Sequence, residues 1–261
     1  MQETYVALSG ALAIERRMAT IANNISNANT AGYRADHVTV AGIRANPDYA
    51  IMTGSTDSAL RVDPPAPNFF DALYASLNRD AIDYSPGFTR ETKVPSDVAI
   101  DGDGFFAVKT PQGERYTRAG NFAVSPDGIL KTVDGYPVLG VGGQEIKTGG
   151  ARFVIKPDGT VLDAKGAETG RIRIVAIPDK ALLAKEGAGL FNVTRKNFQP
   201  QEADMKKTQL RQGWLEGSNV EVVDELVDMI QIERAYQSFQ KIIQTSEETD
   251  GHLIAAAAGG Q

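Results

Sequence analysis

The sequence has 261 residues, which is enough for one or two domains with a sizeable core. Its net charge of -6 argues against binding of nucleic acid, because nucleic-acid binders need a basic surface. No cysteine is present, so disulfides, thiolate zinc sites and cysteine nucleophiles are excluded.

The first segment predicts a helix from about Glu3 to Ser26. Its apolar residues recur at alternating spacings of three and four, which is a heptad seam made by Ala11, Ile14, Met18, Ile21 and Ile25. Charged residues interrupt the apolar stretch, so the segment matches neither a cleavable signal peptide nor a membrane span. We therefore expect a chain that is cytoplasmic, or exported without cleavage of its N-terminus.

Four asparagines follow at the end of this helix: Asn23, Asn24, Asn27 and Asn29. Asn27 and Asn29, with Gly32 after them, predict a turn, because asparagine and glycine tolerate left-handed backbone. Asn23 and Asn24 still lie inside the helix. Their amides either end the helix or bond to neighbouring chains, and the pattern leaves both readings open.

All twelve prolines lie between Pro47 and Pro200. Because proline breaks helices, long helices are expected only at the two ends of the chain. Residues 34–90 predict an extended connecting region with short strands. Beyond it, turn signals separate short apolar runs, as in a sandwich or barrel-like β domain. The predicted strands are Asp97–Ile100, Phe105–Lys109, Phe122–Val124, Pro137–Leu139, Ala151–Ile155 and Arg171–Ile177.

The C-terminal segment predicts a second long helix, of about 45 Å for roughly 30 residues. Its heptad seam consists of Met229, Ile232, Tyr236, Phe239 and Ile243. Ser218 and Glu221 predict a capping box at its start, and Gly251 predicts its end. Nine acidic residues against Arg234 and Lys241 give residues 213–250 a charge of -7. These charges fit either a complementary neighbour or a solvated face.

The predicted fold class is therefore α+β, with long terminal helices that pair in a coiled-coil-like region and bracket an inserted all-β domain. The expected divisions are a helix and turn over 1–33, the connecting region over 34–90, the β domain over 91–208, and a helix and tail over 209–261. Two helices alone make a thin core, so we expect further copies of the chain to complete it.

The sequence lacks the residues of an active site. His37 and His252 are its only near-neutral bases, and they lie in a predicted loop and in the tail. The Asp101–Gly104 run shares part of a calcium-loop pattern but lacks its later ligands, so it predicts a β-turn. We expect no enzyme activity, no metal and no cofactor.

Three segments resemble one family. ANNISNANTAGYR (residues 22–34) is similar to the N-terminal signature of flagellar basal-body rod and hook proteins, and residues 216–248 are similar to their C-terminal signature. Residues 94–140 resemble the β segment of the rod and short-hook members. Within the family, the opening helix is most similar to the proximal-rod member, and the distal-rod member is the alternative. Ser26 and Ala31 depart from the usual Ala and Pro.

The resemblance implies a non-enzymatic subunit that transmits torque and is delivered by the flagellar type III export apparatus to the periplasmic rod. Its implied partners are other copies of itself, proximal and distal rod proteins, and rod-capping or ring proteins, with no membrane insertion. The expected assembly interface combines the two seams with the two signature turns: Ile14, Met18, Ile21, Asn23, Asn24, Ile25, Asn27, Thr30, Gly32, Tyr33, Gly217, Ser218, Asn219, Met229, Ile232, Tyr236, Phe239 and Ile243.

Two other functions compete with assembly. The β domain could be a binding module for peptidoglycan or a ring protein if Phe105, Phe106 or Tyr116 were exposed, although their strand positions favour burial. A cell-wall hydrolase is suggested only by the periplasmic location that the resemblance implies.

Overall fold

The computed structural model describes residues 2–38, 40–45, 72–77, 81–150, 152–187, 189–195, 198 and 200–258. The chain forms two compact units. The helical unit takes in residues 1–25, 36–82 and 222–261, and the β unit takes in residues 26–35 and 83–221. The predicted β domain over 91–208 falls within the second unit. Among the described helices, none combines the length and apolar character needed to cross a membrane.

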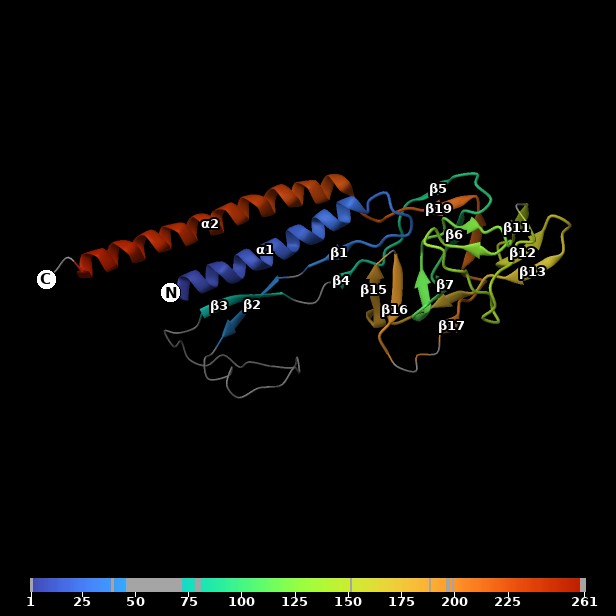
Figure 1. Ribbon diagram of the computed structural model, residues 1–261, viewed down its shortest axis with the longest axis horizontal. Helices are drawn as coiled ribbons and strands as arrows, with labels where there is room; N and C mark the ends of the chain where they lie inside the picture. Colours follow the sequence, from blue (N-terminus) through green and yellow to red (C-terminus); the bar gives the residue numbers. More distant parts are fainter. Residues whose placement is uncertain are drawn as a thin grey trace. The chain divides into compact units, whose positions relative to one another are not determined.

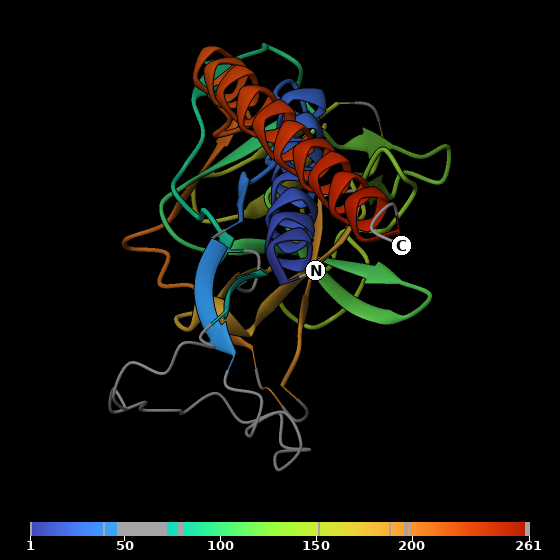
Figure 2. The same ribbon diagram turned by 90° about the vertical axis from the view of Figure 1, so that its left-hand side faces the viewer.

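The helical unit contains the two long helices, α1 (Gln2–Ser26) and α2 (Val222–Ala258). They lie side by side and run in opposite directions (Figures 1 and 2). Four short strands complete the described part of this unit. Two antiparallel pairs join β1 (Asp36–His37) to β4 (Ala81–Ile82) and β2 (Val40–Ala45) to β3 (Ala72–Leu77). These four strands lie within the predicted connecting region, of which residues 46–71 are outside the described part of the chain.

Both predicted ends of α2 are wrong. The helix begins at Val222 rather than beside Ser218, because Ser218 Oγ accepts a hydrogen bond from Val220 N (3.2 Å) in a local turn. The helix also continues through Gly251 to Ala258. One glycine inside a helix costs about 1 kcal/mol relative to alanine, and the following run of alanines favours helix strongly.

The β unit is built on a six-stranded antiparallel sheet in the order β15-β16-β8-β7-β14-β17 (Figure 1). Its strands are β7 (Phe105–Thr110), β8 (Gly113–Thr117), β14 (Ile174–Ala176), β15 (Leu183–Gly187), β16 (Leu190–Val193) and β17 (Gln201–Glu202). A 3-10 helix, Lys180–Leu182, precedes β15, and the Asp179 side chain caps it by accepting from Ala181 N (3.2 Å).

Smaller antiparallel sheets surround this one. A three-stranded sheet contains β11 (Phe153–Ile155), β12 (Thr160–Asp163) and β13 (Glu168–Arg171). Three two-stranded sheets pair β9 (Ala123–Val124) with β10 (Leu130–Lys131), β18 (Gln209–Gln212) with β6 (Val98–Asp101), and β19 (Trp214–Glu216) with β5 (Thr89–Glu91). Residues 209–216 therefore form two strands of the β unit, whereas the sequence analysis grouped them with the last helix.

One apolar core fills the β unit. Its fully buried members include Val98, Phe106, Leu130, Val138 and Val161, which come from different sheets and turns. Phe106 and Phe122 meet edge to face, with ring centroids 4.9 Å apart. The apolar positions that alternate along the short strands therefore supply the core, as the sequence pattern indicates.

Five of the six predicted strand runs contain a strand of the structure. The exception is Pro137–Leu139, which makes only isolated bridges, to Lys131, Val108 and Glu145. Proline cannot donate to a ladder, which limits regular pairing at this position. The sequence did not predict β8, β12, β13, β15 or β16, whose residues are half polar and become strands through their partners in the sheets.

Candidate functional site

The turn after α1 is locked by its own side chains. Thr30 N donates to Asn27 O (3.0 Å), and Thr30 Oγ1 donates to Asn27 Oδ1 (3.1 Å). Gly32 then takes a left-handed conformation with φ +64° and donates from its N to Glu216 O (2.9 Å). A Cβ at Gly32 would overlap the backbone of Arg118 and Ala119. This position therefore requires glycine for both conformation and space.

A buried ion cluster lies beside this turn. Glu216 accepts from Arg34 Nη2 through Oε1 (2.5 Å) and from Arg118 Nη1 through Oε2 (3.2 Å). Its Oε1 also accepts from Gly87 N (3.1 Å). The side chains of Arg34 and Glu216 are about 1% and 2% exposed, so both charges are removed from water. Burial lowers the pKa of Arg118, and the neighbouring Glu216 carboxylate opposes that shift.

This Arg–Glu–Arg cluster joins three distant parts of the sequence. Arg34 ends the N-terminal signature, Glu216 begins the C-terminal signature, and Arg118 follows β8 inside the β segment. Because a buried charge that lost its partner would be strongly unfavourable, each of the three segments holds the others in place. We call residues 27–35 and 216–219, together with Arg118, the signature junction.

Asn219 makes a second set of bonds in the signature junction. Its Oδ1 accepts from Ala35 N (2.7 Å), and its Nδ2 donates to Asp83 O (3.0 Å) and Ser85 O (3.3 Å). One side chain thus bonds both to the segment that enters the connecting region, at Ala35, and to the segment near its end, at Asp83 and Ser85. These bonds also keep residues 217–219 out of α2, which explains the late start of that helix.

Tyr33 and Gly217 complete the junction. The Tyr33 ring is buried, and Lys185 Nζ lies 4.1 Å from its centroid while donating to Arg34 O (2.5 Å). Gly217 N donates to Phe88 O (2.8 Å), and the backbone at Gly87 approaches Gly217 so closely that a Cβ on Gly87 would overlap it. Thr30, Gly32, Tyr33, Gly217 and Asn219 therefore all take part in contacts within the β unit.

The two helices contact each other at points along their length. Arg17 Nη2 lies 3.4 Å from Asp228 Oδ2, and Asn24 Nδ2 donates to Glu225 Oε1 (2.8 Å). Asn24 also exchanges hydrogen bonds with the backbone of Asp36, through Nδ2 (2.9 Å) and Oδ1 (3.0 Å). The buried Asn24 amide thus bonds within its own chain, whereas Asn23 is exposed on the helix surface.

The predicted heptad positions lie on the inward sides of both helices. Ala11, Ile21 and Ile232 are buried, and Gly10 is so close to Phe239 that a Cβ there would lie 2.7 Å from the ring. The remaining seam residues are half-buried: Ile14, Met18, Ile25, Met229, Tyr236, Phe239 and Ile243. Their partial exposure leaves apolar surface along the seam.

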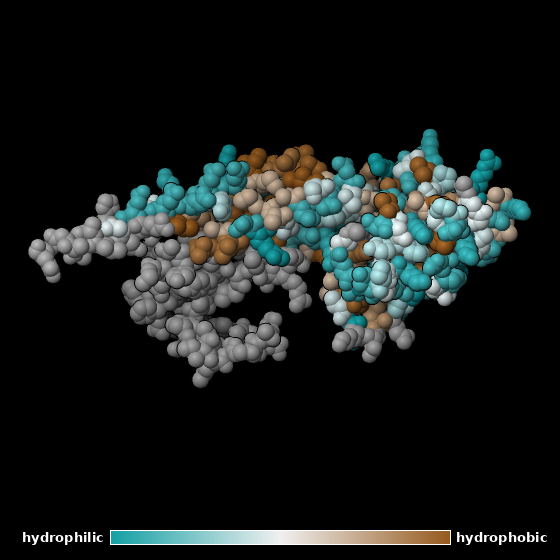
Figure 3. Space-filling model, in the orientation of Figure 1, coloured by the Kyte–Doolittle hydropathy of each residue, from teal (hydrophilic) through white to brown (hydrophobic). Residues whose placement is uncertain are grey.

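The start of α2 carries a second apolar face that the sequence analysis missed. We call it the exposed stripe: Val223, Leu226, Val227 and Ile230, each between 46% and 73% exposed. Val223 and the buried Ile232 are about two and a half helical turns apart, so the stripe faces away from the seam. Figure 3 shows this apolar surface along the first part of α2.

The aromatic residues of the binding-module hypothesis are buried. Phe105, Phe106 and Tyr116 are each 5% exposed or less, so they do not form the exposed aromatic surface that this hypothesis requires. Burial, assisted by the neighbouring Glu114, raises the pKa of Tyr116 above its usual range. Within the described residues, no group of three or more His, Asp or Glu side chains is placed to hold a metal ion.

Sequence reasoning missed both the ion cluster and the exposed stripe. Arg34, Arg118 and Glu216 were visible in the sequence only as charged residues within the three family-like segments, and the separations of 98 and 182 residues hid their pairing. The stripe had a clearer signal. Val223, Leu226, Val227 and Ile230 follow the same three-four spacing as the seam, on the opposite side of the helix.

The two units define a class of chain: one unit pairs the two terminal helices, and the other is an inserted β domain that holds both signature turns; among the described residues, α2 also carries an exposed apolar stripe. Comparison with known families agrees with this description. The family model "Flagella basal body rod protein" matches residues 5–34, "Flagellar hook protein FlgE/F/G D1 domain" matches residues 99–162, and "Flagellar basal body rod FlgEFG protein C-terminal" matches residues 211–256.

Named relatives match along almost the whole chain. The flagellar basal-body rod protein FlgF of Caulobacter vibrioides is 35% identical over 94% of this chain and 93% of its own length. FlgG of Bacillus subtilis is 34% identical over 97% and 98%, and FlgF of Salmonella typhimurium is 30% identical over 95% and 94%. The chain belongs to the flagellar basal-body rod protein family.

Proposed function

We propose that this chain is a structural subunit of the flagellar rod, without enzyme activity, which polymerises through its terminal helices and transmits torque. The observation that carries the proposal is the two-sided α2: its seam side contacts α1, whereas its exposed stripe has no cover among the described residues. An apolar face of this kind on a soluble helix favours packing against another protein.

Neighbouring copies supply that cover in our proposal. Burial of the stripe stabilises each contact by about 25 cal/mol per Å² of apolar surface removed from water. The half-buried seam residues pack as a coiled-coil-like layer that further helices complete, and Asn23 and Asn27 lie at its edge. Open-ended contacts between different patches of identical subunits generate helical filaments, which is the form that a rod requires.

Membership of the family supports a proposed location and proposed partners. We propose that the subunit occupies the proximal rod, as the similarity of its opening helix to proximal members suggests, with the distal rod as the alternative. Its partners are then other copies, neighbouring rod proteins, and capping or ring proteins. Delivery by the flagellar type III export apparatus, without cleavage, would keep the helices unassembled until they meet the growing rod.

The exposed stripe provides the test. A Leu226→Glu/Ile230→Glu variant places two charges on the stripe without touching the seam or the β unit. We expect it to fold with unchanged helix content by circular dichroism, to be absent from basal bodies in electron micrographs, and to leave cells non-motile. The reason is that burying two unpaired carboxylates costs several kcal/mol per contact.

The matched control is Gln240→Glu/Gln244→Glu, which adds the same two charges at the same spacing to exposed positions of α2 beyond the stripe. Cells carrying this control should swim normally, because no apolar surface is lost. Normal motility and normal incorporation of the Leu226→Glu/Ile230→Glu variant would reject assembly through the stripe.

A further inference from the structure

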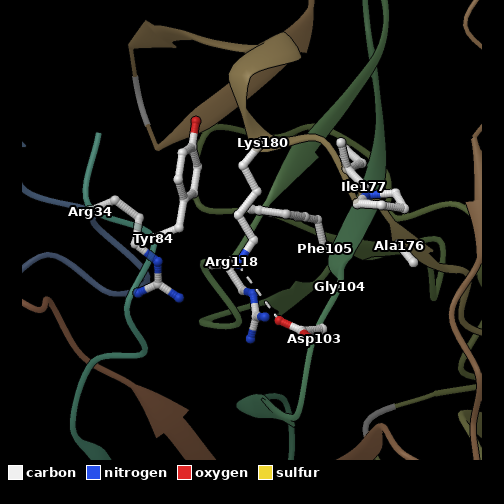
Figure 4. A pocket seen from close by; sticks show the side chains of 10 residues that line it. Arg34, Tyr84, Asp103, Gly104, Phe105, Arg118, Ala176, Ile177 and Lys180 are labelled. Carbon is white, nitrogen blue, oxygen red and sulfur yellow. Dashed lines mark ion pairs between the residues drawn. The ribbon is translucent and has the colours of Figure 1, made fainter. Parts of the chain in front are cut away.

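The β unit contains a pocket of about 320 Å³ beside the signature junction. Arg34, Arg118 and Lys180 bring three cationic side chains to its wall, and Phe105 and Ile177 contribute apolar surface. In Figure 4, the Arg34 and Arg118 guanidinium groups lie on the same side of the pocket. The end of Lys180 points towards them. Cationic and apolar groups thus line a single space.

The pocket has more positive than negative charge around it. The two arginines share one carboxylate, that of Glu216. Lys180 Nζ lies 3.7 Å from Asp103 Oδ1, but the Asp103 side chain is 89% exposed, so water weakens this pair. Three cations therefore face one buried and one solvated carboxylate.

Two buried nitrogen atoms in this wall lack acceptors among the described residues: Nη1 of Arg34 and Nε of Arg118. Arg118 does bond to backbone oxygens, donating from Nη2 to Gly102 O (2.8 Å). A buried guanidinium with an unfilled donor is unfavourable unless an anion or acceptor approaches it. These unfilled donors leave the positive charge of the two guanidinium groups incompletely compensated behind the pocket wall.

We propose that this pocket binds the carboxylate of a small organic acid or of an acidic side chain. Lys180 is the accessible cation that contacts the carboxylate, and the two arginines provide fixed positive charge behind it. The apolar wall made by Phe105 and Ile177 accommodates a short hydrocarbon chain, which favours an organic carboxylate over inorganic phosphate. The pocket includes no residue of the exposed stripe, so its test does not depend on assembly through that stripe.

Titration calorimetry with glutarate at constant ionic strength tests the pocket on the full chain. We expect saturable binding to one site, weakened at least tenfold by Lys180→Gln and largely kept by Lys180→Arg. The control is Lys109→Gln, which removes another exposed lysine that pairs with Glu145 at 3.2 Å. It should bind glutarate as the unchanged chain does.

Two further ligands identify the source of the carboxylate. N-acetylglutamate amide, which imitates a glutamate side chain within a protein, should bind at least as well as glutarate if the natural ligand is a neighbouring acidic residue. Tighter binding of free glutarate would assign the pocket to a small acid. Absence of saturable binding by both ligands, equal binding by the Lys180→Gln variant, or equally tight binding of inorganic phosphate would overturn the proposal.

Discussion

At the residue scale, the Glu216 carboxylate decides how the signature segments meet. It forms ion pairs with two guanidinium groups, accepts from the backbone at Gly87, and is about 2% exposed. A buried ion pair is weak evidence of net stabilisation, but removing one partner leaves an uncompensated charge in the interior. Stability of the β unit should therefore depend on this one charge more than on any surface ion pair.

The variant Glu216→Gln keeps the shape of the side chain and removes its charge. We expect it to lower the free energy of unfolding by about 3–5 kcal/mol, because two buried arginines are left without a counter-ion. Urea denaturation measures the change. Glu145→Gln, which breaks the exposed pair with Lys109, should cost less than about 1 kcal/mol. Equal losses in both variants would mean that burial of the cluster has no energetic consequence.

At the element scale, the turn over residues 27–35 and the start of α2 show how local signals compete with tertiary contacts. Ser218 and Glu221 have the spacing of a capping box, yet the helix begins only at Val222. The Asn219 side chain bonds to three backbone groups, Ala35 N, Asp83 O and Ser85 O. These bonds stabilise the non-helical conformation of residues 218–221 more than an added helical turn would. The helix α2 therefore begins only after the last residue whose side chain is bonded within the signature junction.

Gly32 tests the close packing of that turn. Gly32→Ala introduces a methyl group into the backbone of Arg118 and Ala119, in addition to the cost of a left-handed alanine. Gly143→Ala is the matched control, since Gly143 has φ +77° and no atom within 4 Å of the added carbon. We expect a loss of about 1 kcal/mol in the control and about 1–3 kcal/mol beyond it in Gly32→Ala.

Thermal and urea unfolding of the two glycine variants measure this difference directly. Because both glycines lie in the β unit, the same transition reports on both variants. If Gly32→Ala lost no more stability than Gly143→Ala, the close approach of the turn to Arg118 would not contribute to folding.

At the scale of the whole molecule, the division into two units makes a prediction about truncation. A chain that ends at Glu221 loses α2 but retains every described segment of the β unit. We expect its β unit to unfold with an unchanged cooperative transition, while the chain no longer enters the rod. A chain that ends at Leu215 lacks Glu216 and should lose that transition or unfold at much lower denaturant. Loss of the transition in the longer chain would show that the β unit depends on α2.

Much of the architecture was predictable from the sequence. The confinement of proline to residues 47–200 separated the helical ends from the β-rich middle, and the heptad spacing identified the seam residues, of which Ile21 and Ile232 are buried. Alternating runs such as Phe105–Lys109 located core strands, because a half-buried sheet requires apolar residues at every second position. The predicted role of the seam and signature residues in assembly stays a prediction.

The amino-acid sequence by itself determined the two terminal helices, their heptad seams, the β-rich middle and the resemblance to rod proteins, since these depend on local periodicity and on contiguous strings. Only the tertiary structure decided that Arg34, Arg118 and Glu216 form one buried cluster, that Asn219 replaces a helical turn, and that the stripe on α2 is exposed among the described residues. The physical reason is that pairing and burial depend on which distant segments meet. Local spacing carries no record of partners 98 or 182 residues away.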